Sequence, residues 1–174
     1  MKHTLLALLL LLPLAVFAQE EDDDVNYDVM GVRFGSSRNV VRNTLQNSYG
    51  ALDFDDADED YIAYLDKTYD GQKWDIVAFY FVNRNGSQKF NKCVMTVLCK
   101  TLDEARYARD RIARKWRQNF TLVTRYKGDD GEAYYLGGTS PTDSNAYGYR
   151  IDLDTSTITG YPYSATISYG GYDY

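Results

Sequence analysis

The chain has 174 residues, of which 25 are acidic and 19 basic, and its net charge at neutral pH is −6. This acidic balance argues against nucleic acid or an anionic membrane surface as a partner, because both attract clustered positive charge. The sole histidine is His3, so the chain beyond it has no imidazole to activate a nucleophile or bind a transition metal. We therefore expect a protein that is not an enzyme and uses no cofactor.

The first 18 residues have the pattern of a signal peptide. Lys2 and His3 form a short basic region, an apolar run covers residues 5–17, and small residues precede a cleavage point after Ala18. The sequence therefore predicts export to the periplasm or the cell exterior, with no membrane insertion after cleavage. An acidic, disordered leader is expected over residues 19–30.

Residues 31–174 are expected to form one domain that begins with a short helix. Ser36 or Ser37 is placed to cap this helix, and Gly50 is placed to end it. Its apolar stripe comprises Val40, Val41, Leu45 and Tyr49.

The acidic run after this helix contains candidate calcium ligands, namely Asp53, Asp55, Asp56 and Asp58. An EF-hand loop starting at Asp53 would need glycine at Asp58 and glutamate at Tyr64, and the sequence has neither. A solvated acidic loop is the preferred interpretation.

Three strands near residues 61–68, 73–83 and 88–99 then predict an antiparallel meander. Asp70-Gly71 and Asn85-Gly86 are both typical of type I′ turns, in which both central residues have positive φ. A two-residue turn at Asp70-Gly71 would set Asp66 opposite Asp75, which is a disfavoured pair. We therefore expect a longer loop or a shifted register there.

Both faces of the segment IVAFYFV are apolar, which is typical of a strand covered on two sides. A regular two-residue hairpin would pair Phe79 with Lys92 and Val77 with Val94 on the face away from the second helix. This face is a candidate contact surface, formed by Val77, Phe79, Phe81, Phe90, Lys92 and Val94. The alternative is that the rest of the chain covers these residues as core.

Two cysteines lie on the third strand of the meander. Six residues of extended chain separate Cys93 from Cys99 by about 20 Å, which is too far for a disulfide. We expect two buried thiols, with a sharply bent strand or an intermolecular bond as the alternatives.

A second amphipathic helix follows, with Thr101 and Glu104 as a capping box. Its apolar positions are Leu102, Ala105, Ala108, Ile112 and Trp116. About four more strands are predicted, near residues 120–126, 133–136, 147–153 and 161–169.

These elements predict an α+β fold in the order α-βββ-α-ββββ, with antiparallel sheet and both helices on one face. The order looks like one unit used twice, over residues 31–99 and 101–174. Tyrosines of the last two strands alternate with polar residues and share parity with Ile151 and Ile167, which favours core over ligand contact.

The segments GVRFGSS and VVRNTLQNSYG, followed by IAYL and a capped helix, resemble small exported proteins of Bacteroides-type bacteria with no assigned function. This resemblance implies an envelope or secreted location and supplies no catalytic residues. The doubled layout is also similar to tandem-repeat inhibitory or assembly modules of the bacterial envelope.

The preferred hypothesis is an exported, non-enzymatic interaction module whose partner is an unknown protein or glycan. One alternative is a carbohydrate-binding protein or a two-carboxylate glycoside hydrolase that uses surface tyrosines. Another is a small outer-membrane barrel, against which the two amphipathic helices argue.

Overall fold

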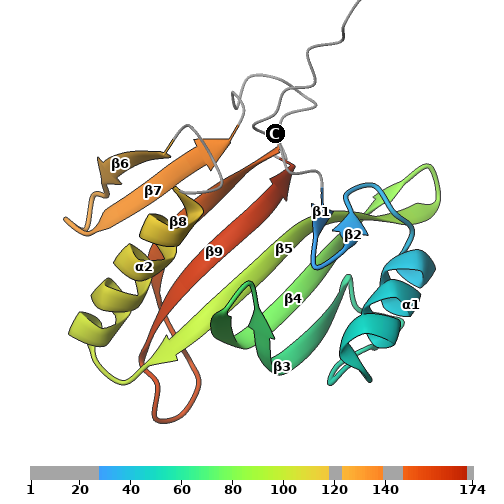
Figure 1. Cartoon of the computed structure of the whole chain (residues 1–174), viewed down its shortest axis with the longest axis horizontal. Helices are drawn as coiled ribbons and strands as arrows, with labels where there is room; N and C mark the ends of the chain where they lie inside the picture. The colour runs from blue at the N-terminus through green and yellow to red at the C-terminus, as the bar shows by residue number, and fades with distance from the viewer. Residues whose placement is uncertain (1–27, 118–122, 139–146, 172–174) are drawn as a thin grey trace, which may run out of the picture.

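The computed structural model describes residues 28–117, 123–138 and 147–171 (Figure 1). Within these residues the protein is α+β, with two helices and a seven-stranded antiparallel sheet in the order β3-β4-β5-β9-β8-β7-β6. The strands of this sheet are β3 (Tyr61–Tyr69), β4 (Gln72–Arg84), β5 (Ser87–Cys99), β6 (Val123–Lys127), β7 (Ala133–Gly138), β8 (Tyr147–Thr155) and β9 (Tyr163–Gly171). The helices are α1 (Arg38–Tyr49) and α2 (Leu102–Trp116), and a separate hairpin comprises β1 (Asp28–Val29) and β2 (Val32–Arg33). The predicted signal peptide lies outside the described residues.

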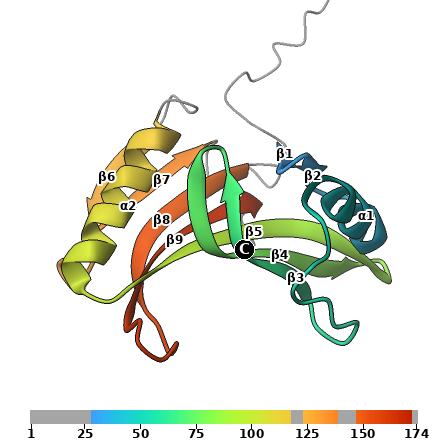
Figure 2. The same cartoon turned by 60° about the horizontal axis from the view of Figure 1, so that its bottom comes forward.

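Both helices and the β1–β2 hairpin lie on the same face of the curved sheet (Figure 2). α2 contacts β8, β9 and β5, whereas α1 contacts β5 and β2. One core cluster fills the space between the helices and the sheet, and it includes residues from both halves of the chain, such as Leu45, Phe79, Ile112 and Ile167. The pairing of β5 with β9 joins the two halves in one sheet.

α1 begins after Ser37 and ends at Gly50, as the sequence predicted, although the Ser37 side chain makes no capping hydrogen bond. The predicted apolar stripe is wrong at one position. Val41 and Leu45 are fully buried, but Val40 is 53% exposed and points away from the core. Arg38 takes a buried position in its place.

The predicted cap of α2 is confirmed. The backbone N–H of Glu104 donates to Oγ1 of Thr101 at 3.2 Å. The Glu104 carboxylate in turn accepts from the backbone N–H of Lys100 at 2.8 Å, one residue earlier than in a standard capping box. These bonds satisfy two backbone donors at the point where the chain leaves β5.

The β1–β2 hairpin is a structural element that the sequence analysis missed. It lies partly inside residues 19–30, where a disordered leader was expected; residues 28–30 are instead ordered. Val29 and Met30 are almost fully buried, and Met30 and Gly31 have the positive φ angles of a type I′ turn. Each strand has only two residues, which is too short for an alternating pattern to be recognised in the sequence.

The expected longer loop or shifted register between β3 and β4 is wrong. Tyr69 pairs directly with Gln72 across a two-residue turn. Asp66 does stand opposite Asp75 in this register, but its φ of 52° interrupts regular pairing at that point. Asp66 binds Lys73 at 3.0 Å, and Asp75 accepts from the backbone N–H of Leu98 at 2.7 Å. Each carboxylate therefore has its own partner, which removes the conflict.

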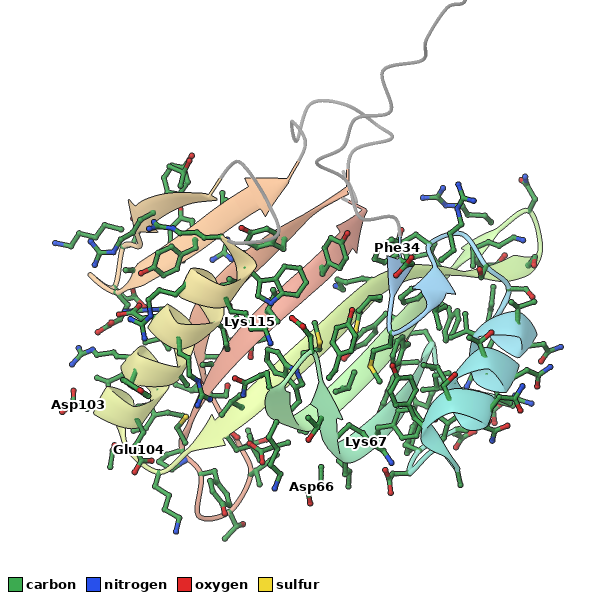
Figure 3. The ribbon with its side chains drawn as sticks, in the orientation of Figure 1. Phe34, Asp66, Lys67, Asp103, Glu104 and Lys115 are labelled. Carbon is green, nitrogen blue, oxygen red and sulfur yellow. The ribbon has the colours of Figure 1, made fainter. Side chains whose placement is uncertain are left out.

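Beyond Asp66 the end of the β3–β4 hairpin curls toward the helices (Figures 1 and 2). Lys115 of α2 binds Asp70 of the turn at 3.0 Å, and Figure 3 shows Lys115 beside this curled end. The curl also brings Trp74 into the core cluster, where it is 2% exposed. The hairpin end thus closes the core between the two helices.

The β4–β5 hairpin has the predicted two-residue turn, but its register changes once. Phe81 pairs with Phe90 as expected, whereas Tyr80 pairs with Lys92, so Asn91 is the extra residue of a β-bulge. From the bulge onward every residue of β5 lies one position from its predicted partner.

Both cysteines are buried and not in a disulfide, as predicted. Burial raises the pKa of the Cys93 thiol and that of Cys99. Cys93 and Cys99 face the core together with Met95, so they act as small apolar side chains.

The predicted strands of the second half are present with shifted ends. The prediction began the first of them at Phe120, and residues 118–122 lie outside the described part. Tyr149 and Tyr169 are each 1% exposed and belong to the core cluster, which confirms the core interpretation for these two tyrosines.

Candidate functional site

The sheet face opposite the helices is the candidate functional site, and we call it the second face. Cross-strand pairing places Tyr61, Tyr80 and Lys92 in one row across β3, β4 and β5. The next row on this face contains Ala63, Ala78 and Val94, and the row after it contains Leu65, Ile76 and Thr96. Over β3–β5 the second face comprises Tyr61, Leu65, Ile76, Tyr80, Lys92, Val94, Thr96 and Leu98.

The side chains of the second face on β3, β4 and β5 are partly accessible to solvent, although most of them are apolar. Leu65 is 52% exposed, and Ile76, Val94 and Leu98 are half-buried. None of them belongs to the core cluster, and in the described part of the chain no helix lies over them. The described structure therefore leaves an aliphatic stripe on a sheet that is covered on its other side.

An aromatic row borders this stripe. The ring of Tyr61 stacks on Phe54 with the centroids 4.8 Å apart, and it lies 5.4 Å from the ring of Tyr80. Lys92 Nζ lies 5.3 Å from the centroid of Tyr80. Desolvation by burial, followed by the nearby Tyr61 and Asp60, raises the pKa of the Tyr80 hydroxyl, which stays neutral and can donate a hydrogen bond. Each side chain of this aromatic row therefore contacts at least one other member of the row.

Beyond β5 the second face becomes polar. Ser164, Thr166 and Ser168 of β9 pair with Leu98, Thr96 and Val94 of β5. On the outer strands, the ring of Tyr134 stacks on Tyr126 with the centroids 5.3 Å apart, and the Arg150 guanidinium lies 4.7 Å from the Tyr134 centroid. Arg150 also forms an ion pair with Asp152. The second face thus changes from aliphatic to hydroxyl-rich and charged across the sheet.

The structure separates the six residues predicted as a contact surface. Val77, Phe79, Phe81 and Phe90 are at most 3% exposed and lie in the core beneath the helices, so the core alternative holds for these four. Lys92 and Val94 lie on the second face.

The bulge at Asn91 is the physical reason for this separation, because a shift of one residue reverses the face of every later side chain. Lys92 consequently pairs with Tyr80 and Val94 with Ala78, not with Phe79 and Val77. Sequence reasoning missed Tyr61, Leu65, Ile76, Tyr80 and Leu98 as accessible residues. The alternation of Ile76, Ala78 and Tyr80 is visible in the sequence, but it does not show which face the helices cover.

Three of the four predicted calcium candidates, Asp53, Asp55 and Asp56, use their carboxylates for contacts within the protein. The carboxylate of Asp55 binds Arg38 at 3.1 Å and Arg42 at 2.7 Å. Asp53 accepts from the backbone N–H of Leu65, and Asp56 accepts from that of Asp58. Among the described residues, no group of three or more acidic, cysteine or histidine side chains could hold a metal ion.

Arg38 organises this acidic segment from a buried position. It is 7% exposed, and its guanidinium donates to the backbone carbonyls of Asp56 at 2.6 Å and Tyr61 at 3.2 Å and to that of Glu59. Its guanidinium also lies 5.5 Å from the centroid of the Phe81 ring. The buried cation therefore holds the loop that leads into the second face.

A similar cluster anchors α2 to the other end of the sheet. Arg109 is 4% exposed and donates to the carbonyl of Ala133 at 2.8 Å, and Arg106 and Arg109 both bind Glu132. Burial alone would raise the pKa of Asp110, but hydrogen bonds from Arg109 and Tyr135 outweigh it and hold that pKa below its usual value. Hydrogen bonding to Arg106 also lowers the pKa of Glu132.

Comparison with known proteins adds no identification: no family model, no curated protein and no solved structure matches this chain. Within the described residues, neither helix has the length and apolar character needed to cross a membrane.

Proposed function

We propose that this protein is an exported, non-enzymatic interaction module of the bacterial envelope or the cell exterior, and that it binds a protein partner through the second face. One observation carries the proposal: the helices cover a single face of the sheet, while the stripe of Leu65, Ile76, Val94 and Leu98 on the other face is partly exposed in the described structure. The location rests on the signal-peptide pattern at the N-terminus.

The composition of the second face suits a protein interface. Fully burying a Val, Leu or Ile side chain contributes about 1.5–3 kcal/mol, so completing the burial of a few half-covered residues is worth several kcal/mol. Tyrosine rings already held by Phe54 and Lys92 would lose little side-chain entropy on binding. The hydroxyl groups and charges on β8 and β9 supply a polar border, as in known interfaces.

A protein partner is favoured over a glycan because the rings on this face are already occupied. The ring of Tyr61 stacks on Phe54 and that of Tyr134 stacks on Tyr126, while Tyr80 and Arg150 lie within 5.4 Å and 4.7 Å of the same two rings. A sugar-binding platform needs the flat side of a ring open to the ligand, and each of these two rings already has another ring stacked on a flat side.

Affinity capture from the native envelope tests the proposal, with the mature chain and two matched variants as bait. Val94→Asp places a charge in the aliphatic stripe, whereas Val40→Asp places the same charge on the exposed side of α1. We expect Val94→Asp to lose the captured protein and Val40→Asp to retain it, with both variants folded by circular dichroism. Equal capture by the two variants would exclude the second face as the binding surface.

The same proposal includes a doubled architecture. The strand order around the central β5–β9 pair is β5-β4-β3 on one side and β9-β8-β7-β6 on the other, and in each half a helix precedes the strands of this sheet. Each helix also carries a buried arginine, Arg38 or Arg109, that donates to backbone carbonyls. We infer two related units over residues 31–99 and 101–174, whose described strands together present the second face.

A further inference from the structure

The two edge strands of the sheet, β3 and β6, differ in whether their outer backbone groups are hydrogen-bonded. At β3 the neighbouring backbone is occupied: Ala63 exchanges hydrogen bonds with Phe54, and the N–H of Leu65 donates to Asp53 Oδ2 at 2.8 Å. Such coverage is a common protection of an edge strand against pairing with other chains. At the opposite end the sheet stops at β6, which pairs only with β7 among the described strands.

The parity of β6 shows which of its backbone groups face outward. The N–H of Gly128 donates to the carbonyl of Glu132 at 2.7 Å, so alternate residues Tyr126 and Thr124 direct their N–H and C=O groups to β7. Arg125 and Lys127 then direct theirs away from the sheet. The described structure contains no hydrogen bond to these outward groups.

The edge also has a defined shape and charge. A cavity of about 440 Å³ lies against it, lined by Arg125, Tyr126, Lys127, Gly131 and Ala133. The lining includes two cations and no carboxylate, in a chain whose net charge is −6. Arg125 and Lys127 are exposed, and their partners in the register, Tyr135 and Ala133, place them on the helix side of the sheet.

We propose that the outer edge of β6 binds an extended, acidic segment of a partner protein, which adds to the sheet as an eighth strand. The outward N–H and C=O groups of Arg125 and Lys127 supply the backbone pairing. Acidic residues at alternate positions of the added strand lie opposite the two cations, where cross-strand pairs of opposite charge are stabilising. The proposed backbone pairing is distinct from the aliphatic stripe of the second face and does not depend on the function of that stripe.

Synthetic peptides test this directly. One capped eight-residue peptide alternates glutamate with valine, and a second has the same composition with its four glutamates before its four valines. We expect the alternating peptide to bind at least tenfold more tightly by fluorescence anisotropy. Equal binding of the two peptides would mean that net charge alone, and not strand pairing, determines the affinity, and it would overturn the proposal.

Amide hydrogen exchange followed by NMR identifies the edge itself. On binding, exchange at Arg125 and Lys127 should slow at least tenfold, whereas Thr124 and Tyr126, already paired with β7, should change little. Binding without slower exchange at Arg125 and Lys127 would place the peptide elsewhere and overturn the proposal.

Reversing the charges of the two β6 cations tests their contribution to binding, and the same change elsewhere on the sheet serves as the control. The double variant Arg125→Glu with Lys127→Glu should weaken the alternating acidic peptide at least tenfold and gain affinity for an alternating lysine–valine peptide. The double variant Arg84→Glu with Lys89→Glu, which changes the same residue types near the β4–β5 turn, should retain the original affinity. If both double variants weaken binding equally, the contribution of the β6 cations is refuted.

Discussion

Gly170 of β9 lies directly against the backbone of Asn91, the bulged residue of β5. A Cβ atom on Gly170 would stand 2.2 Å from the Asn91 carbonyl oxygen and 2.7 Å from the Lys92 Cα. Both obstacles are backbone atoms at the pairing of the two halves of the sheet, so neither can move without disturbing the register. The bulge that selects the residues of the second face therefore requires glycine on the neighbouring strand.

The first prediction concerns this contact. Gly170→Ala should lower the free energy of unfolding by about 1–3 kcal/mol, the usual cost of overpacking, and by more if the bulge is lost. Urea denaturation measures the effect, and Ser168→Ala on the same strand serves as a control with little expected change. A Gly170→Ala protein as stable as the original would show that the close contact does not constrain the sheet.

The second prediction concerns Arg38. Arg38→Met should cost about 3–5 kcal/mol, because it leaves the carbonyls of Asp56 and Tyr61 without their donor and Asp55 with only the partly exposed Arg42 as partner. Arg42→Met removes only a partly exposed ion pair with Asp55 and should cost about 0–1 kcal/mol. Thermal or urea unfolding compares the two variants. Similar losses for both would mean that burial of Arg38 has no special energetic role.

The third prediction concerns the backbone at Asp66, whose φ is 52°. Asp66→Val should destabilise the protein by about 1–2 kcal/mol, because a β-branched residue is strained at positive φ. Asp66→Gly should be tolerated, since it relieves strain and removes only an exposed ion pair with Lys73. The order of melting temperatures should be Gly above Val. The reverse order would indicate that the bend does not need a positive φ.

The fourth prediction concerns acid stability. Because the pKa of Asp110 is lowered in the folded state, its ionised form stabilises the protein above the pKa of the unfolded chain. That contribution is lost as the pH falls below about 4, through the unfolded and then the folded pKa. Asp110→Asn should therefore lower stability at pH 7 and flatten its decrease between about pH 5 and pH 2. Urea titrations across this range measure both effects, and parallel curves for the two proteins would contradict the assignment.

The sequence by itself was sufficient for features set by local chemistry. The Asn85-Gly86 turn and the Thr101 cap of α2 depend on residues only a few positions apart, and both are present as predicted. The Asp70-Gly71 pair also forms its two-residue turn, although a longer loop or a shifted register was expected there. The two buried thiols followed in the same way, because alternation along one strand determines that Cys93 and Cys99 share a face.

Tertiary structure alone decided which faces meet. The bulge at Asn91 depends on Gly170, which is 79 positions away in the chain, and no local pattern indicates that contact. The conflict between Asp66 and Asp75 is resolved by Lys73 and by the backbone of Leu98 on another strand, so the short turn could form after all. Side-chain alternation determines only that two faces exist; which one is covered depends on where the helices and the second half of the sheet pack, and that is a property of distant contacts.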